Sequence, residues 1–259
     1  MKLLLHACCG PCSLEPVRLL QAAGHTLSLA YMNANIHPPS EYARRLTTLA
    51  TWAANEHLTV IEGAYDKDAW EQQVGCFGIA AETREDRCRA CYRLRLEEAA
   101  HYAASHGFEG IATTLSVSPY QYTALIEEEL KRAAAAEKIA AVFEDFRPFY
   151  PQATQASKAL GMYRQNYCGC RYSAIEAACE REQRADERRA RKQAERSAHA
   201  AQREEAETQR LAKKRARQEY AAKQTAKRIA KDRLRNQKHT EDPSENTTPN
   251  TKETLHENQ

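Results

Sequence analysis

The sequence has 259 residues, a formal net charge of +3 and nine cysteines. No run of 18 apolar residues occurs, and the short apolar run at residues 3–5 ends at His6, so we expect neither a membrane span nor a secretory leader. We therefore expect a cytoplasmic, reducing location, in which cysteines suit metal binding or redox chemistry better than a disulfide framework. The glycine-rich dinucleotide fingerprint and the P-loop pattern are absent, which leaves nicotinamide and nucleoside-triphosphate chemistry without support.

Apolar strands alternate with helices along the first 178 residues. Strands are predicted at 2–7, 26–32, 58–62, 110–115 and 139–143, and helices at 13–23, 38–55, 120–136 and 154–161. The first helix takes Ser13 as its N-cap, and a mainly helical stretch at 64–102 is interrupted near 75–78 and by a turn at Cys88 and Cys91. This alternation predicts an α/β, Rossmann-like fold with a mainly parallel sheet and helices on both faces.

Three chemically distinctive segments each follow a predicted strand. They are 8–12 after the first strand, 113–120 at the end of the fourth, and 145–147 after the fifth. Ligands of open parallel sheets bind beyond the carboxyl ends of the strands. We therefore expect the site at this edge of the sheet.

The composition changes near residue 180. We expect a catalytic α/β domain at 1–179, a basic helical arm at 180–238 and a disordered acidic tail at 239–259. The arm has 20 Lys and Arg against 10 Asp and Glu, and it contains no Gly or Pro. Such an arm suits a nucleic acid, or it is a solvated charged helix.

Seven of the nine cysteines fall into three short motifs, Cys8-Cys9-x-x-Cys12, Cys88-x-x-Cys91 and Cys168-x-Cys170. Two C-x-x-C pairs predict a structural zinc site or an iron–sulfur cluster, since both take four thiolates. The adjacent Cys8 and Cys9 make five cysteines at two places, more than a zinc knuckle needs, which favours iron. The C-x-C pair can close a strained, redox-active disulfide. The lone Cys76 and Cys179 are interpreted as structural or neutral.

Several longer motifs contain these cysteines or lie between them. They are His6-Ala7-Cys8-Cys9-Gly10-Pro11-Cys12, the segment 31–38 with Glu41-Tyr42 and Arg45, Arg87-Cys88-Arg89-Ala90-Cys91-Tyr92 with Arg95-Leu96, the segments 113–120 and 145–147, and Tyr163-Arg164-Gln165-Asn166-Tyr167-Cys168-Gly169-Cys170. Together, and in this order, they resemble the QueH family of epoxyqueuosine reductases. The resemblance covers residues 1–178 and leaves the arm outside.

The resemblance implies an oxidoreductase that reduces epoxyqueuosine in the anticodon loop of tRNA to queuosine, the last step of queuosine biosynthesis. It implies a 4Fe–4S cluster on Cys8, Cys9, Cys88 and Cys91, an additional mononuclear iron with Cys12 as a candidate ligand, and a redox-active pair at Cys168 and Cys170. An electron donor is also required, and the sequence does not identify it.

Candidates for the remaining roles come from residue chemistry. Asp145 or Tyr163 is a candidate proton donor. Bases of single-stranded RNA stack on aromatic rings and on Arg planes, and the candidates for substrate binding are Tyr92, Tyr120, Arg147, Tyr163 and Arg164. Two alternatives stay open: a zinc-stabilised RNA-binding protein without catalysis, and a tRNA sulfur-transferase, although the pyrophosphate loop of that class is missing after the first strand.

Overall fold

The computed structural model describes residues 1–240, except for the side chains of residues 81 and 237–240. The chain divides into two units, Met1–Arg184 and Ala185–Gln259. The predicted acidic tail lies outside the described residues, apart from residues 239 and 240, which are helical.

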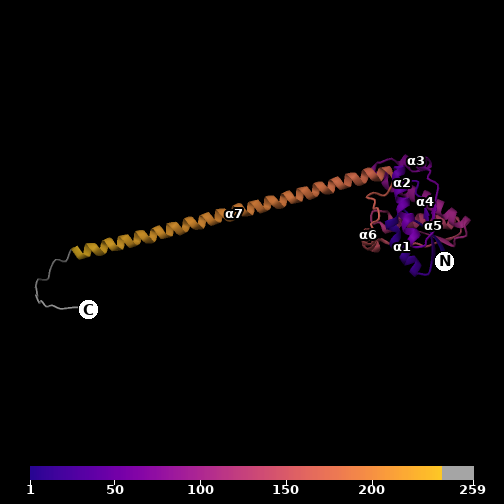
Figure 1. The fold of residues 1–259 in the computed structure, drawn as a ribbon. Coiled ribbons are helices and arrows are strands. Elements are labelled where there is room, and N and C mark those ends of the chain that lie inside the picture. Colours follow the sequence, from indigo (N-terminus) through magenta and orange to yellow (C-terminus); the bar gives the residue numbers. More distant parts are fainter. Residues whose placement is uncertain (241–259) are drawn as a thin grey trace, which may run out of the picture. The chain divides into compact units, whose positions relative to one another are not determined.

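Five strands and seven α-helices make up the described part of the chain (Figure 1). The strands are β1 Lys2–His6, β2 Thr26–Tyr31, β3 Val60–Glu62, β4 Gly110–Thr113 and β5 Ala140–Ala141. The helices are α1 Gly10–Ala22, α2 Pro39–Asn55, α3 Lys67–Gln73, α4 Arg84–Ser105, α5 Thr123–Ala136, α6 Tyr150–Ala159 and α7 Arg171–Thr240.

The strands form one parallel sheet in the order β3-β2-β1-β4-β5. β1 lies at the centre, where Leu4 pairs with Ser28 of β2 on one side and with Ile111 of β4 on the other. The chain winds outward from β1 through β2 and β3 and then returns to place β4 on the opposite side. At this switch point the connections leaving β1 and β4 diverge, and a crevice opens beyond their carboxyl ends. The predicted α/β fold is confirmed.

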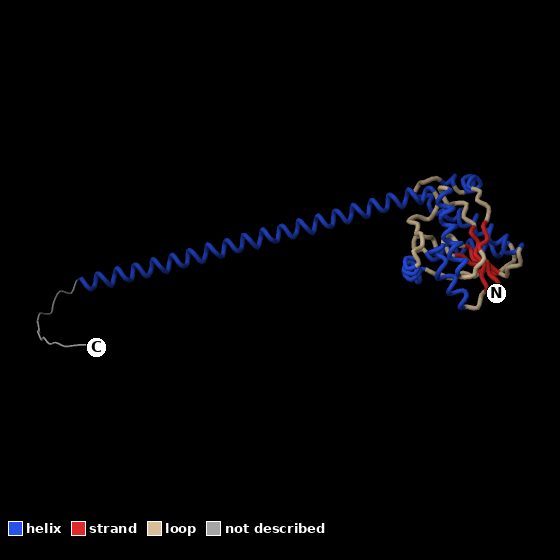
Figure 2. Tube along the Cα trace, in the orientation of Figure 1, coloured by secondary structure: helices blue, strands red, loops and turns tan. Residues whose placement is uncertain are grey.

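Helices cover both faces of the sheet, which Figure 2 shows as red strands among blue helices. Side chains alternate between the faces along β1, so the fully buried Leu3 and Leu5 pack toward α1, α2 and α6, whereas Leu4 packs toward α4 and α5. Burying each leucine contributes roughly 1.5–3 kcal/mol. Burial on both faces fixes the position of β1 within the sheet, and therefore the position of the residues that follow it.

The first helix begins earlier than predicted. Cys9, in extended backbone, is its N-cap, and Pro11 occupies the first turn. A proline there loses no helical hydrogen bond, because the first N–H groups have no partner inside the helix. Ser13 lies within the helix, where its hydroxyl donates to the Cys9 carbonyl at 2.8 Å. The N-cap prediction for Ser13 was therefore wrong, and Cys12 belongs to the first helical turn.

The predicted turn at Cys88 and Cys91 was also wrong, because both residues lie inside the continuous helix α4. The predicted break near residues 75–78 is confirmed by a short 3₁₀ turn at Gly75–Phe77, after which Gly78 adopts a φ of +69°. β5 is shorter than predicted, with two residues.

The charged helical extension is confirmed as part of α7. Its residues are strong helix formers, and ion pairs one turn apart, such as Arg191 with Glu195 at 3.6 Å, support it. Among the described residues, no helix has the length and apolar character that a bilayer crossing requires.

Candidate metal centre

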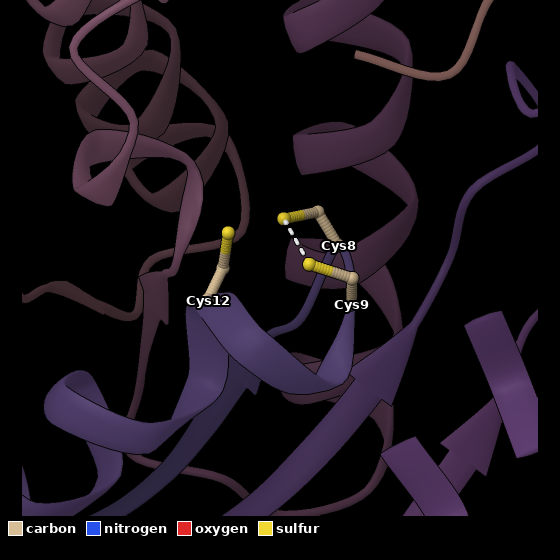
Figure 3. A group of neighbouring side chains, drawn as sticks. All are labelled: Cys8, Cys9 and Cys12. Carbon is tan, nitrogen blue, oxygen red and sulfur yellow. Dashed lines mark hydrogen bonds between the residues drawn. The ribbon is translucent and has the colours of Figure 1, made fainter. Parts of the chain in front are cut away.

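Three cysteine sulfurs meet where β1 runs into α1 (Figure 3). Cys8 and Cys9 occupy the connection, and the first turn of α1 brings Cys12 beside them. The three Sγ atoms lie within 4.8 Å of one another, and those of Cys8 and Cys9 are 3.8 Å apart. Thiolates this close are a ligand set for a soft metal such as zinc or iron.

Side chains from two other segments hold these sulfurs. Thr114, just after β4, accepts the Cys8 backbone N–H at 3.1 Å and donates its hydroxyl to the Cys8 Sγ at 3.5 Å. Gln165 donates its amide to the Cys9 Sγ at 2.7 Å. The cluster therefore lies at the switch point between β1 and β4, as the strand-end argument predicted.

The three thiols do not share their negative charge equally. Hydrogen bonds, first with Cys12 and then with Cys9, lower the pKa of Cys8 well below its ordinary value even though the thiol is buried. The pKa of Cys12 is raised well above the ordinary value, because its proton is held in the hydrogen bond with Cys8. Cys8 is thus the thiol of the group that loses its proton most readily, and the thiolate is the form that binds metals.

The other two cysteine motifs line a small neighbouring cavity. Cys88 and Cys91, one turn apart on α4, lie on its wall with Cys168 and Cys170. Cys168 also lines a larger cavity of about 370 Å³, together with Cys8 and Cys12. Motifs that are far apart in the sequence are therefore brought to two cavities with a shared wall.

Gly169 gives the Cys168–Cys170 segment its shape. Its φ is +149°, and an added Cβ would come within 3.0 Å of Asn35 and Ile36. Its carbonyl accepts from the His37 N–H at 2.9 Å, and the Cys168 carbonyl accepts from Arg45 at 2.8 Å. Both cysteines are free thiols, and burial raises the pKa of each. They are therefore protonated near neutral pH.

Arg95 of α4 is a buried positive charge that forms no ion pair among the described residues, although the Glu98 carboxylate interacts with it at longer range. It is 2% exposed, donates to the Asn33 side chain, and leaves its Nε without a hydrogen-bond partner. The two other arginines buried to this extent are paired, Arg45 with Glu41 and Arg87 with Glu176. An uncompensated buried charge costs several kcal/mol.

The neighbours of Arg95 indicate what compensates it. The guanidinium lines the larger cavity, and one cysteine of each motif interacts with it electrostatically: Cys8, Cys91 and Cys168. Arg95 thus favours an anionic group, thiolates included, at the place where the three motifs converge.

Three of the predicted substrate-binding residues lie at these cavities. Tyr120 is 62% exposed and lines both, and Arg164 lines the larger one, where Thr154 and Ser157 hold its guanidinium. Tyr92 is buried in the wall of the smaller cavity, and its hydroxyl donates to the Gln121 side chain at 2.6 Å.

The remaining candidates line neither cavity among the described residues. Asp145 and Arg147 pair with each other at 2.8 Å, and this hydrogen bond holds the pKa of Asp145 below its ordinary value, which does not suit a proton donor. Tyr163 donates to Glu41 at 2.8 Å and stacks on Arg44. Asp145 and Arg147 thus contact each other, and Tyr163 contacts two residues of α2.

Other cavity residues were not singled out as site residues from the sequence. They are Arg84, Arg95, Thr114, Gln121, Gln165, and Arg181 and Arg184 of α7. Arg95, Thr114 and Gln165 lie inside or beside the motifs, which is a signal that could have identified them. Gln121 contacts both Tyr92 and Cys168 through one oxygen, and no pattern in the sequence predicts that.

The fold and this site define a cysteine-lined α/β protein with a candidate metal centre at its switch point. The family model for "Epoxyqueuosine reductase QueH" matches residues 3–176. The chain therefore belongs to the QueH family, a family of oxidoreductases.

Curated relatives with that same name agree. One from Dehalococcoides mccartyi is 32% identical over 176 residues, covering 68% of this chain and 93% of the relative. One from Acinetobacter baylyi is 34% identical over 176 residues, covering 66% and 80%. A third, from Thermotoga maritima, is 33% identical over 178 residues, covering 67% and 90%. The family match ends at residue 176, so nearly all of α7 lies beyond it.

Proposed function

We propose that this protein is an epoxyqueuosine reductase, which removes the epoxide oxygen of epoxyqueuosine in a tRNA anticodon loop and leaves queuosine. The observation that carries the proposal, beside family membership, is the convergence of three cysteine motifs on two adjoining cavities. A cytoplasmic location, where thiols remain reduced, belongs to the same proposal.

We infer that a 4Fe–4S cluster binds Cys8, Cys9, Cys88 and Cys91, with Cys12 as a ligand of a further iron. The residues fit these groups, because the thiols are buried or partly buried and the Arg95 guanidinium, whose Nε has no hydrogen-bond partner, offsets negative charge among them. When bound, the cluster would supply electrons at low potential and the single iron a Lewis acid for the epoxide oxygen.

The chain's own residues have distinct parts in this proposal. The modified base enters the larger cavity, where the exposed ring of Tyr120 offers a stacking surface at its lining. Arg164, already oriented by Thr154 and Ser157, offers a donor to the substrate. This proposal assigns no role to Asp145 and Arg147, which pair with each other and line neither cavity among the described residues.

Cys168 and Cys170 can supply the electrons and protons that the reaction consumes. Converting an epoxide to an alkene and water consumes two electrons and two protons. Closing a disulfide between two protonated thiols releases the same number, and burial keeps both thiols protonated. Cys168 lines both cavities, so its thiol adjoins the substrate space. An external electron donor then reduces the disulfide for the next turnover.

The test is reduction by anaerobically purified full-length protein of tRNA that carries epoxyqueuosine, with a chemical reductant present. Digestion of the tRNA and mass spectrometry of its nucleosides should show loss of one oxygen atom. Protein that carries iron and sulfide but leaves the epoxide intact would contradict the proposal.

A further inference from the structure

Charge is distributed unevenly along the part of α7 that belongs to the second unit. Residues 185–207 contain six Lys and Arg and six Asp and Glu, whereas residues 208–240 contain twelve Lys and Arg and only two acidic residues. We call these the proximal and distal segments. Neither lies in the part of the chain that matches the family.

The proximal segment is neutral overall and pairs some of its charges internally, whereas the distal segment does neither. Arg189 pairs with Asp186, and Arg191 pairs with Glu195. Through residue 236, where described side chains end, no lysine or arginine of the distal segment pairs with a carboxylate, and all of these side chains are exposed. Like charges one turn apart destabilise a helix. A polyanion would relieve this repulsion.

The spacing of the charges matches a phosphate backbone. From Arg210 to Lys238 the helix rises about 42 Å, which gives one positive charge per about 3.5 Å. A strand of B-form DNA carries one phosphate per about 3.4 Å of its axis. The distal segment therefore has a charge density of the same order as that of a nucleic acid, although its charged side chains point to more than one side of the helix and only part of them can contact one backbone.

The apolar residues of the distal segment argue against a membrane surface. Leu211, Tyr220, Ile229 and Leu234 are exposed and are separated by nine, nine and five residues. At about 100° per residue these steps place neighbouring members on opposite or nearly opposite sides of the helix. A helix that lies in a membrane interface needs its apolar residues on one face.

We propose that the distal segment, residues 208–240, is a binding surface for the phosphate backbone of RNA and reads no sequence. The phosphate chemistry follows from the charges alone, whereas the choice of RNA rests on the proposed function. The segment would raise the local concentration of tRNA through contacts with phosphates.

The test compares two full-length variants that each lose four positive charges. The distal variant is Lys213→Gln, Lys214→Gln, Arg215→Gln and Arg217→Gln, and the matched control is Arg188→Gln, Arg189→Gln, Arg191→Gln and Lys192→Gln. Glutamine retains helix propensity, and circular dichroism checks that α7 is intact. Fluorescence anisotropy then measures binding to a tRNA transcript and to an unrelated RNA across a salt series.

The distal variant should bind both RNAs about tenfold more weakly at low salt, and its slope of log Kd against log salt should fall by up to about 3, since each phosphate contact contributes roughly 0.7–0.9. The control should bind as the unchanged protein does. Three results would overturn the proposal. The two variants could lose RNA affinity equally, the distal variant could lose affinity for tRNA alone, or it could lose binding to anionic phospholipid vesicles and not to RNA.

Turnover separates this proposal from the reductase proposal. At saturating tRNA the distal variant should retain kcat while KM rises. If no variant or parent protein reduces epoxyqueuosine, the reductase proposal fails, but the binding comparison still decides the role of the distal segment.

Discussion

Buried charge is the residue-scale feature on which the proposed site depends most. Arg45, Arg87 and Arg95 are all removed from water, but among the described residues only Arg95 forms no ion pair, and Glu98 interacts with it only at longer range. A partner carboxylate would offset the cost of burial within the polypeptide. For Arg95, the offset comes from the thiolates and from what they bind.

Replacing Arg95 should therefore have opposite consequences in the two forms of the protein. In Arg95→Met, the metal-free protein should unfold at the same denaturant concentration as the parent or a higher one, because an uncompensated charge is gone. The same variant should retain less iron, because negative charge on the ligands loses its counterpart. Denaturant unfolding and iron analysis measure the two effects.

Arg45→Met is the control for that prediction, because it leaves the Glu41 carboxylate buried without its ion pair. It should destabilise the metal-free protein by about 3–5 kcal/mol. Arg95→Lys, which retains the charge, should recover most of the iron. If Arg95→Met destabilised the metal-free protein as much as Arg45→Met, Arg95 would be an ordinary structural residue.

The cysteine pair gives a second residue-scale prediction. Cys168→Ser and Cys170→Ser should each abolish turnover, since neither can close the disulfide, while the visible absorption of the bound cluster persists. Cys76→Ser is the matched control, because Cys76 is an exposed thiol outside both cavities, and it should retain full activity. Loss of the absorption in Cys168→Ser would make Cys168 a metal ligand instead.

Variants of Cys12 test whether the protein holds an additional iron beside the cluster. A carboxylate also ligates iron, so Cys12→Asp should retain part of the activity, whereas Cys12→Ala should lose both the additional iron and the activity. Iron quantification and turnover give the answer. A Cys12→Ala protein with its full iron content and activity would show that no second metal depends on this residue.

At the scale of elements, the cysteines of α4 depend on how that helix packs on α5. Glu129 of α5 is 2% exposed and bonds Arg93 of α4 at 2.9 Å and Arg132 of its own helix at 2.8 Å. Burial acts to raise the pKa of Glu129, but the hydrogen bonds from Arg93 and Arg132 outweigh it and lower the pKa to about 2. The ionised carboxylate thus joins the two helices.

Glu129→Gln should lower the free energy of unfolding by about 1–2 kcal/mol at neutral pH. Because the folded pKa is depressed, this contribution is complete above the unfolded pKa of about 4.3 and disappears as the pH falls toward 2. Unfolding of both proteins across that range measures it. Glu128→Gln, which removes an exposed carboxylate next to it, should change stability by less than about 0.5 kcal/mol.

At the scale of the whole molecule, metal content distinguishes the proposed reductase from a zinc-stabilised RNA-binding protein. Anaerobically purified protein should be brown and contain about four irons and four sulfides, with one further iron if Cys12 holds it. Metal analysis and a sulfide assay test this. Stoichiometric zinc without acid-labile sulfide would instead favour the zinc protein, which the close grouping of Cys8, Cys9 and Cys12 could also accommodate.

The order of strands and helices could be predicted because the buried strands are short apolar runs between turn signals. The start of α1 was predicted less well. The serine at position 13 indicated a later start and Pro11 an earlier one, and the extended backbone of Cys9 shows that the earlier start is the correct one. Arg95 belongs to one of the motifs, but its burial could not be predicted, for a different reason. α4 carries charged residues around most of its surface, so no apolar stripe marks which arginine faces the interior.

The arrangement of the cysteine motifs also sets a time order for biosynthesis. Cys8 is synthesised 162 residues before Cys170, which joins the chain only when nearly the whole α/β domain has been made, so the site cannot assemble around an early fragment. At least the 89 residues from 171 to 259 are still to be added at that moment. At 5–20 residues per second this takes roughly 4–18 s. The domain can thus fold and receive its metal while the ribosome still holds the growing arm.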